Sequence, residues 1–261
     1  MNDSLELALE AAAVGGATVM KHYGKHPSVE QKLDGSPVTV ADVEADRAIK
    51  DILFRSGLVV VSEEGEKSAM SAEHYWLVDP LDGTKDFLAG TGEFTVNVAL
   101  VEYGVPTLGV VLAPAKGDIY WGERGRGAWR IREGVAEKLG QATTSPEPRM
   151  VTSRSESPEE LEIFMNTNLI VESISVGSAL KYGLLAAGEC EVIPRLVGSS
   201  EWDTGAGQAV LEASGGHVVE WDTGKPLRYG KPRRRNPRLL SFRSPYQLEN
   251  FKRKTYVSEV S

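Results

Sequence analysis

Acidic side chains occur at four points of the chain where a predicted helix begins or a predicted strand ends. They are Asp42, the pair Glu63-Glu64, the pair Asp79 and Asp82, and Asp203. Loops at such points bring functional groups together in layered α/β proteins. Carboxylate oxygens are also the ligands that hard cations such as Mg²⁺ prefer. The four points together form a constellation that could hold a metal ion through oxygen ligands, or could simply be part of a solvated acidic surface.

The stretch that begins at Asp79 is the most informative of the four. Asp79 ends a predicted strand, and Pro80 is expected to stop that strand. Asp82 follows three positions later, so a tight turn can aim both carboxylates and the carbonyl of Leu81 at one point. Gly83 allows close backbone approach, and the amides after it are expected at a helix N-terminus, where an anion is favoured. Taken alone, the same stretch is also explained as a turn with a helix cap.

Each of the other acids also has an ordinary structural explanation. Glu63-Glu64 follows a predicted buried strand, and two adjacent carboxylates are most often part of an exposed loop. Asp203 lies where a helix is predicted to start and could be its N-cap. Asp42 has the spacing from Thr39 that a capping box requires. The case for a site rests on the joint occurrence of these acids.

The elements that must position the acids follow from hydrophobic periodicity. Residues 93–121 are expected to form a three-stranded antiparallel meander, and residues 25–37 a loop. The segment 140–148 is the best candidate boundary between an α+β half, 1–145, and an α/β half, 146–261, within one compact unit. Helices are predicted over 4–23, 39–53, from 158, 178–187 and 203–213, and strands over 58–62, 75–79, 93–101, 107–112, 118–121, 150–153, 191–195 and 216–220.

Composition narrows the possible functions. The 261 residues include 29 Lys and Arg, 37 Asp and Glu, four His and one Cys, so disulfides and thiolate zinc sites are excluded. The net charge of −8 argues against nucleic acid as the main partner. The short basic run 231–235 is expected to be a solvated loop or a docking tail. The acidic N-terminus and the lack of a long apolar stretch predict a cytoplasmic protein without a membrane span.

Taken together, the motifs resemble a known superfamily, the Mg²⁺-dependent, lithium-sensitive phosphatases. Its members include inositol monophosphatase, fructose-1,6-bisphosphatase and the 3′(2′),5′-bisphosphate nucleotidases. The resemblance runs in order from the first helix to Gly216, and it is carried by Asp42, Glu63-Glu64, Asp79-Pro-Leu-Asp-Gly-Thr84 and Trp202-Asp203-Thr-Gly-Ala-Gly207. It implies an α+β fold, a layered αβαβα sandwich of the inositol monophosphatase and sugar phosphatase type. The match to the nucleotidase branch is closest, because of Asp34-Gly-Ser-Pro-Val-Thr-Val-Ala-Asp42, Lys85, and Gly177-Ser-Ala-Leu-Lys181 leading to Pro194-Arg195.

The resemblance also implies roles for individual residues. The side chains of Glu63, Asp79, Asp82 and Asp203 and the carbonyl of Leu81 would hold two or three Mg²⁺ ions. Glu63, Leu81, Asp82 and Asp203 would also face the substrate, with the amides of Gly83 and Thr84 around its phosphate oxygens. Thr84 and Asp42 would orient the attacking water and help to remove its proton, and Glu64 would hold a water on the metal. No paired Ser, Cys or His nucleophile is visible, so phosphate is expected to pass directly to water.

Substrate preference rests on Ser178, Lys181 and Arg195, which match nucleotide-contacting positions of the nucleotidases. Two cations suit a second phosphate, although a helix-surface charge and a strand-end charge would explain them equally well. The expected activity is removal of the 3′-phosphate from adenosine 3′,5′-bisphosphate (PAP). The enzyme is also expected to act on the sulfated relative of PAP (PAPS). Glu156 stands where relatives often have His.

Two other functions stay open: an inositol-1-monophosphatase or sugar phosphatase, and a non-catalytic module that binds Ca²⁺ or phosphate. The resemblance is compatible with a monomer or a homodimer. It is also compatible with peripheral association at the inner membrane.

Overall fold

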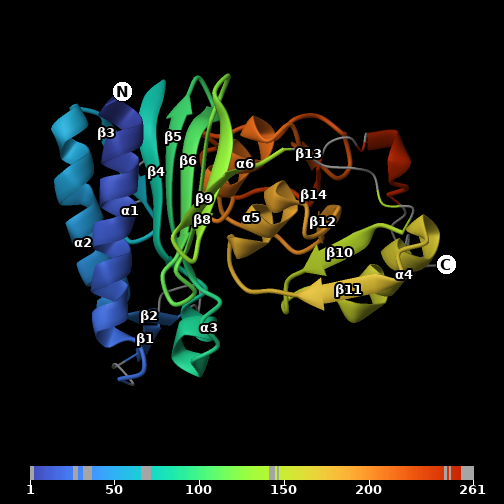
Figure 1. Ribbon diagram of the computed structural model, residues 1–261, viewed down its shortest axis with the longest axis horizontal. Coiled ribbons are helices and arrows are strands. Elements are labelled where there is room, and N and C mark those ends of the chain that lie inside the picture. Colours follow the sequence, from blue (N-terminus) through green and yellow to red (C-terminus); the bar gives the residue numbers. More distant parts are fainter. Residues whose placement is uncertain are drawn as a thin grey trace.

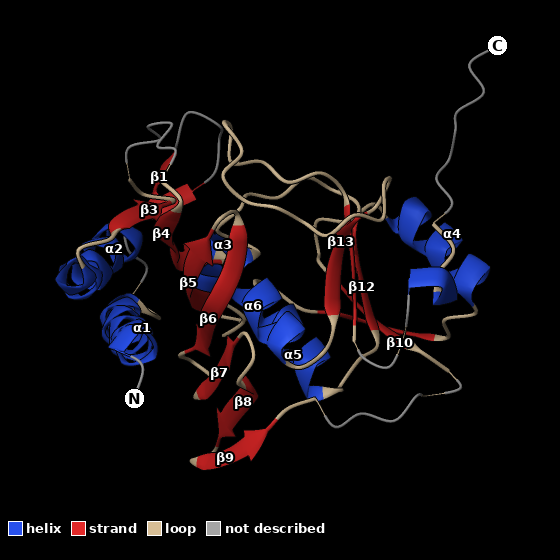
Figure 2. Ribbon diagram, turned by 90° about the horizontal axis from the view of Figure 1, so that it is seen from above, coloured by secondary structure: helices blue, strands red, loops and turns tan. Residues whose placement is uncertain are grey.

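The computed structural model describes residues 3–25, 29–31, 37–65, 72–140, 145, 147–243, 246 and 248–253. Two sheets are separated by one pair of helices and covered on their outer faces by other helices (Figures 1 and 2). This arrangement confirms the predicted α+β class and the αβαβα layer order. The layers of helices are α1 (Asp3–His22) and α2 (Val40–Leu53) outside the first sheet, α5 (Leu180–Ala187) and α6 (Gly205–Ala213) between the sheets, and α4 (Pro158–Asn168) outside the second. The short helices α3 (Thr84–Ala89), η1 (Phe54–Ser56) and η2 (Leu248–Asn250) complete the described helices.

The first sheet has seven strands that follow one another in chain order, with β3 and β4 parallel and every later pair antiparallel. The predicted meander is confirmed, but it continues through two strands that were not predicted. All four residues of the second of these strands are exposed, which leaves no hydrophobic pattern to detect. The first is partly buried, and its apolar residues Trp129 and Ile131 alternate with Arg130 and Arg132 over four positions only. The strands are β3 (Val59–Ser62), β4 (His74–Asp82), β5 (Thr95–Glu102), β6 (Val105–Ala113), β7 (Asp118–Glu123), β8 (Gly127–Arg132) and β9 (Val135–Lys138).

Strand β4 does not stop at Pro80, so that prediction was wrong. Its partner β5 is paired on both sides of the proline, at Asp79 with Asn97 and at Asp82 with Thr95. The register shifts between these two pairs, because two residues of β4, Pro80 and Leu81, lie opposite one residue of β5, Val96. Such an irregularity is where a strand can accept a proline without losing its pairing. Both predicted metal-binding aspartates therefore lie on one continuous strand.

The second sheet is mixed. Its strands lie in the order β11-β10-β12-β14-β13, with β10 parallel to β11 and β12, and β14 antiparallel to β12 and β13. Strands β11 and β14 were not predicted; all four residues of β11 are exposed at the sheet edge, which leaves no hydrophobic pattern to detect. The strands are β10 (Arg149–Thr152), β11 (Glu172–Ser175), β12 (Val192–Arg195), β13 (His217–Glu220) and β14 (Leu239–Phe242).

The predicted loop over 25–37 is in part a strand pair, because β1 (Val29–Gln31) pairs with β2 (Pro37–Thr39). Residues 26–28 and 32–36, which include Asp34, lie outside the described part of the chain. So do 141–144 and 146, within the proposed boundary 140–148, and the division into halves stays a prediction.

Helix α6 lies directly on the first sheet because two neighbouring strands each have a glycine, which has no side chain, at the point of contact. Gly109 of β6 faces Gly122 of β7 across the pair. A Cβ atom at Gly109 would lie 2.3 Å from the carbonyl oxygen of Ala206, and one at Gly122 would lie 2.8 Å from Cα of Val210. Any side chain at either position would push the helix away. The glycine pair therefore fixes the depth of α6 and of the loop before it, which carries Asp203.

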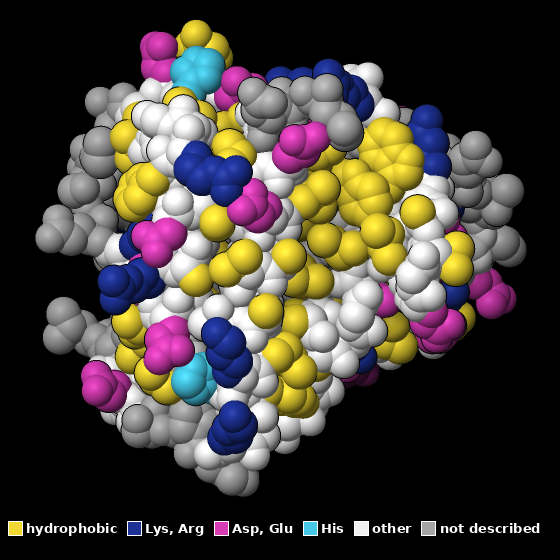
Figure 3. All heavy atoms as spheres, turned by 60° about the vertical axis from the view of Figure 1, so that its left-hand side comes forward, with side chains coloured by type: hydrophobic (Ala, Val, Ile, Leu, Met, Phe, Trp, Pro, Cys, Tyr) yellow, Lys and Arg dark blue, Asp and Glu magenta, His cyan; other side chains and the backbone are white. Residues whose placement is uncertain are grey.

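Charge and hydropathy of the described residues agree with the sequence analysis. On the face shown in Figure 3, Lys and Arg side chains are scattered among Asp and Glu and do not gather into one basic surface. None of the helices in the described ranges has the length and apolar character needed to cross a bilayer.

Candidate active site

Parallel pairing of β3 and β4 places Glu63 beside Asp79. Ser62 is aligned with Val78, and the amide of Glu63 donates a hydrogen bond of 3.2 Å to the carbonyl oxygen of Val78. The residues that follow this pair leave the same edge of the sheet together. Glu64 is the next residue in the turn and is half-buried.

Hydrogen bonds hold the carboxylates of Asp79 and Asp82 at the irregular end of β4. The amide of Leu81 donates to Oδ1 of Asp79 at 3.1 Å. Oδ2 of Asp82 accepts from the amide of Ala179 at 2.6 Å and from Nδ2 of Asn97 at 3.3 Å. Gly83, with φ of 90°, then starts α3 from the left-handed region, where glycine is favoured. The helix predicted behind this stretch is confirmed, but the turn is confined to Gly83 rather than spanning Asp79 to Asp82. Both aspartates accept hydrogen bonds from the donors named above.

Asp42 and Thr84 meet although they are far apart in the chain. Oδ2 of Asp42 accepts from the amide and the hydroxyl of Thr39, at 2.8 and 2.7 Å, which confirms the predicted capping box of α2. Its other oxygen, Oδ1, accepts from the Thr84 hydroxyl at 3.2 Å. The same hydroxyl lies 3.3 Å from the carbonyl oxygen of Leu81. One oxygen of the buried Asp42 is thus anchored, and the other orients Thr84.

Residues from both sheets converge on a small cavity of about 70 Å³. Asp203 is not the N-cap of α6, which is Thr204; its Oδ2 instead accepts from the amide of Ser200 at 2.8 Å. The cavity brings Asp82 together with Lys181, Arg195 and Asp203, which lie 99 to 121 positions further along the chain. It is lined by Asp82, Ser153, Ser178, Lys181, Tyr182, Ile193, Arg195, Ser199, Asp203 and Thr204.

The acids of this site repel one another. Burial raises the pKa of Asp79 well above its ordinary range, and the charges of Glu63, Asp82 and Asp203 raise it further. Burial likewise raises the pKa of Asp82, against the opposing effect of Lys181. The pKa of Asp203 rises from 3.8 to about 7, mainly through burial and then through Asp82. Without a cation these carboxylates hold protons that free carboxylates would lose.

This repulsion predicts a pH-dependent stability of the metal-free protein. The folded state binds a proton at Asp203 more tightly than the unfolded chain does. Its contribution is therefore fully present below about pH 4 and is lost as pH rises toward about 7. In EDTA, the unfolding midpoint temperature should be higher near pH 5 than near pH 8. D203N should show a smaller difference, and an equal slope in the two proteins would contradict the assignment.

The donor set fits a hard divalent cation in its chemistry. Buried carboxylates that repel one another are stabilised by a cation between them, and Mg²⁺ accepts carboxylate and carbonyl oxygen. Glu63, Asp79, Asp82, Asp203 and the carbonyl of Leu81 would hold it. Among the described residues, no three His, Cys, Asp or Glu side chains already converge as a ready-made metal site. The ligand set thus stays a prediction, supported by the mutual electrostatic effects of the four acids.

Lys181 and Arg195 supply the positive charge of the cavity. Lys181 is buried rather than on a helix surface, and its Nζ donates to the carbonyl oxygens of Ser178 at 2.5 Å and Val176 at 3.4 Å. Burial lowers the pKa of Lys181 to about 8, against the effect of Asp82. Arg195 ends β12 and forms an ion pair of 2.8 Å with Glu156. Interpreting Lys181 as a helix-surface charge is therefore wrong.

The basic run 231–235 supports the loop that carries Asp203. Glu201 is fully buried and accepts from the amides of Gly230 and Lys231, at 3.1 and 2.9 Å, and from Nη1 of Arg234 at 3.1 Å. The Arg234 guanidinium also lies over the Tyr75 ring, 5.1 Å from its centre. The prediction of a solvated loop or tail is wrong for Arg234, because this segment is tied into the core.

Removing the charge of Glu201 should therefore destabilise the protein strongly. E201Q removes the fully buried charge that pairs with the buried Arg234 at 3.1 Å and with the partly exposed Lys231 at 2.9 Å. The free energy of unfolding should therefore fall by about 3 kcal/mol or more. Urea unfolding measures the change. D222N is the matched control, because Asp222 pairs with Arg238 at an exposed site, where the loss should stay below about 1 kcal/mol. Equal losses in the two variants would refute the supporting role.

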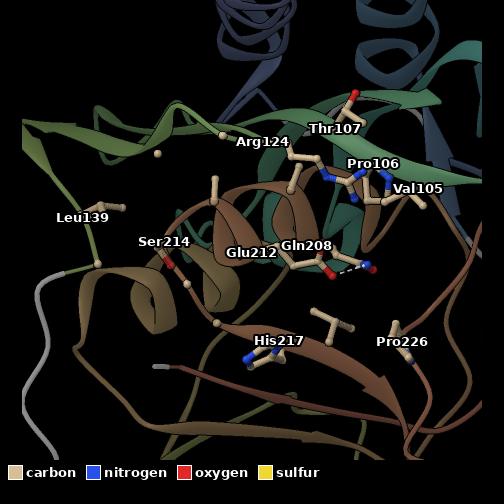
Figure 4. Close-up of a pocket in the computed structure, with 18 of the residues that line it drawn as sticks. Val105, Pro106, Thr107, Arg124, Leu139, Gln208, Glu212, Ser214, His217 and Pro226 are labelled. Carbon is tan, nitrogen blue, oxygen red and sulfur yellow. Dashed lines mark hydrogen bonds between the residues drawn. The ribbon is translucent and has the colours of Figure 1, made fainter. Parts of the chain in front are cut away.

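A second, wider cavity of about 900 Å³ lies at the other end of α6 (Figure 4). Gln208 and Glu212 reach it from the helix and are joined by a hydrogen bond of 2.7 Å. Val105, Arg124 and His217 line its other walls. It shares no residue with the predicted site, so size alone would have located the site wrongly.

Sequence analysis missed several residues that hold the site. Asn97 donates to Asp82, and its signal was a polar residue inside an apolar strand. Asn236 donates to the carbonyl oxygen of Ser200 at 2.8 Å and to Oγ1 of Thr204 at 3.0 Å. No local pattern marks Asn236, because its partners lie more than thirty residues away.

Comparisons with known proteins agree with this geometry. The model of the inositol monophosphatase family matches residues 1–243. The 3′(2′),5′-bisphosphate nucleotidase CysQ of Shigella flexneri is 41% identical over 232 residues, which cover 86% of this chain and 93% of that protein. CysQ of Escherichia coli strain K12 is 40% identical with the same coverage.

Solved structures give the same result. CysQ from Bacteroides thetaiotaomicron, a bacterial member of the inositol monophosphatase family, has a TM-score of 0.80 at 35% identity and covers 93% of this chain and 98% of its own. An IMPase of Thermotoga maritima has a TM-score of 0.76 at 26% identity, with 92% of each chain covered. This chain belongs to the inositol monophosphatase family.

Proposed function

We propose that this chain is an Mg²⁺-dependent 3′(2′),5′-bisphosphate nucleotidase that hydrolyses the 3′-phosphate of PAP to AMP and phosphate. The observation that carries the proposal is the cavity in which Asp82 and Asp203 face Lys181 and Arg195. Carboxylates suit the metal that serves the reacting phosphate, and two cations suit a second phosphate on the same substrate. The named CysQ relatives support the same substrate class.

The chain's own residues account for water activation. Bound Mg²⁺ would lower the pKa of water and offset the charge of the phosphate. The Thr84 hydroxyl donates to Asp42, so its lone pairs can accept a hydrogen bond from the attacking water and orient it. Asp42, whose orientation is fixed by Thr39, would help to remove the proton of the attacking water through the Thr84 hydroxyl. The amides of Gly83 and Thr84, at the start of α3, would contact phosphate oxygens, and the role of Glu64 in holding a water is proposed as well.

Direct transfer of the phosphate to water, without a covalent intermediate on the enzyme, is supported by the state of the single cysteine. Cys190 is buried, and that burial raises the pKa of its thiol far above the ordinary range. A protonated buried thiol is a poor nucleophile. It also fits the reducing environment of the cytoplasm, where we place the protein, as a monomer or homodimer, with peripheral membrane association as a further possibility.

The proposal is tested by measuring phosphate release from PAP, PAPS and inositol 1-phosphate in Mg²⁺, with and without Li⁺. We expect kcat/KM for PAP to exceed that for inositol 1-phosphate by at least about 10-fold, because inositol 1-phosphate has no second phosphate for Lys181 and Arg195 to bind. Equal or faster release from the inositol ester would favour an inositol monophosphatase. Binding without release from any substrate would favour a non-catalytic module, and insensitivity to Li⁺ would count against the metal arrangement.

A further inference from the structure

Glu156 is buried beneath the wall of the cavity and does not face it. Its side chain has no exposed surface. One oxygen, Oε2, accepts from the amides of Leu196 at 2.9 Å and Val197 at 3.0 Å. The other, Oε1, accepts from Nη1 of Arg195 at 2.8 Å. All hydrogen bonds of its side chain to described residues are therefore with the segment that starts at Arg195.

This pattern requires a carboxylate. Three donors point at Glu156, and a carboxylate offers acceptors on both oxygens. A neutral imidazole, the group that the family resemblance would imply here, offers a single acceptor. The glutamate is therefore matched to this chain's own loop rather than to a substrate base or sugar.

The contacts use one side of the Arg195 guanidinium and leave the other available. Nη1 donates to Glu156 and to Oγ of Ser155 at 3.2 Å. Nε and Nη2 donate to no residue within the described ranges. Arg195 lines the cavity with Lys181, Asp82 and Asp203. Two N–H groups on one edge of a guanidinium match two oxygens of a phosphate.

We infer that Glu156 is a positioning residue that orients Arg195 toward the second phosphate of the substrate, and so sets the preference for bisphosphates over monophosphates. The inference rests on the proposed function. It assigns to Glu156 no contact with the reacting phosphate. Loss of Glu156 should therefore affect only substrates that carry the second phosphate.

E156Q tests the inference, because glutamine keeps the volume but cannot accept on both sides. The single amide oxygen of glutamine is expected to face the two backbone amides of Leu196 and Val197, because that side has more donors. Its NH₂ group then lies opposite Nη1 of Arg195, which loses its acceptor. We expect KM for PAP to rise about 10- to 100-fold, with kcat nearly unchanged. KM and kcat for adenosine 3′-monophosphate, which lacks the second phosphate, should stay within about 2-fold. In an R195A background, E156Q should add no further loss for PAP.

S155A provides a variant with little risk to folding, since Ser155 is exposed. It removes the weaker partner of Nη1 and should raise KM for PAP in the same direction by about 2- to 5-fold. Equal losses on PAP and on adenosine 3′-monophosphate would overturn the inference, because they would indicate a merely structural role. A wild-type enzyme without a preference for PAP over inositol 1-phosphate would instead overturn the proposed function. Retained preference in E156Q and S155A, with a wild type that discriminates, would overturn the inference alone.

Discussion

Replacing Thr84 by Val should lower kcat for phosphate release from PAP by about 10²- to 10⁴-fold, with little change in KM. Valine keeps the shape of threonine but can neither donate to Asp42 nor accept from water. The hydroxyl lies 3.2 Å from Oδ1 of Asp42, whose other oxygen is anchored by Thr39. The loss should therefore appear in the chemical step, measured as kcat at saturating Mg²⁺ and substrate.

Two comparisons make the Thr84 prediction specific. T84S keeps the hydroxyl and should retain most of the activity. The concentration of Mg²⁺ that gives half-maximal activity should be the same in T84V and wild type, because the predicted metal ligand at this turn is the Leu81 carbonyl rather than the threonine. A T84V enzyme within about 3-fold of wild type would contradict the role of this hydroxyl.

Local signals were sufficient to find the acids of the site. Asp79 and Asp82 follow a strong strand pattern and precede a glycine, and Asp42 occupies the third helical position after Thr39, so each could be placed without knowledge of the fold. Their joint assignment to metal, and the αβαβα layer order, came from the resemblance to a family. Neither could be worked out from periodicity, which identifies elements but not their order in space.

What sequence analysis could not predict depends on long-range contacts. Lys181 looks like an ordinary helix charge, yet α5 lies between two sheets and its lysine is buried. Glu156 and Arg195 meet across 39 positions, and Glu201 and Arg234 across 33. Such pairs have no spacing rule, because they depend on how the second sheet is assembled. The prediction at Pro80 failed for a local reason. Proline usually ends a strand, but the register shift between Asp79 and Asp82 lets β4 continue past it.

Replacing Asp79 by Asn should lower the activity and, in the metal-free protein, raise the stability. Asparagine keeps the volume and the oxygen that accepts from the amide of Leu81 at 3.1 Å. It removes a carboxyl group that, in the folded protein at neutral pH, must either take up a proton or carry a charge that Glu63, Asp82 and Asp203 repel, and either costs stability. Phosphate release should therefore fall by at least about 10³-fold, through loss of a metal ligand. In EDTA, the free energy of unfolding at neutral pH should rise by about 1–3 kcal/mol, measured by urea unfolding.

A matched control distinguishes repulsion from burial as the cause. Asp118 is also buried, but it pairs with Arg132 at 2.9 Å, so D118N removes an attractive charge. The D118N protein should be less stable than wild type, while D79N is more stable. Mg²⁺ should raise the unfolding temperature of wild type more than that of D79N, because only the wild-type site has its full set of carboxylates. An equal rise in both proteins would show that Asp79 does not hold the metal. A loss of stability in D79N like that in D118N would show that Asp79 is stabilised by its neighbours rather than repelled by them.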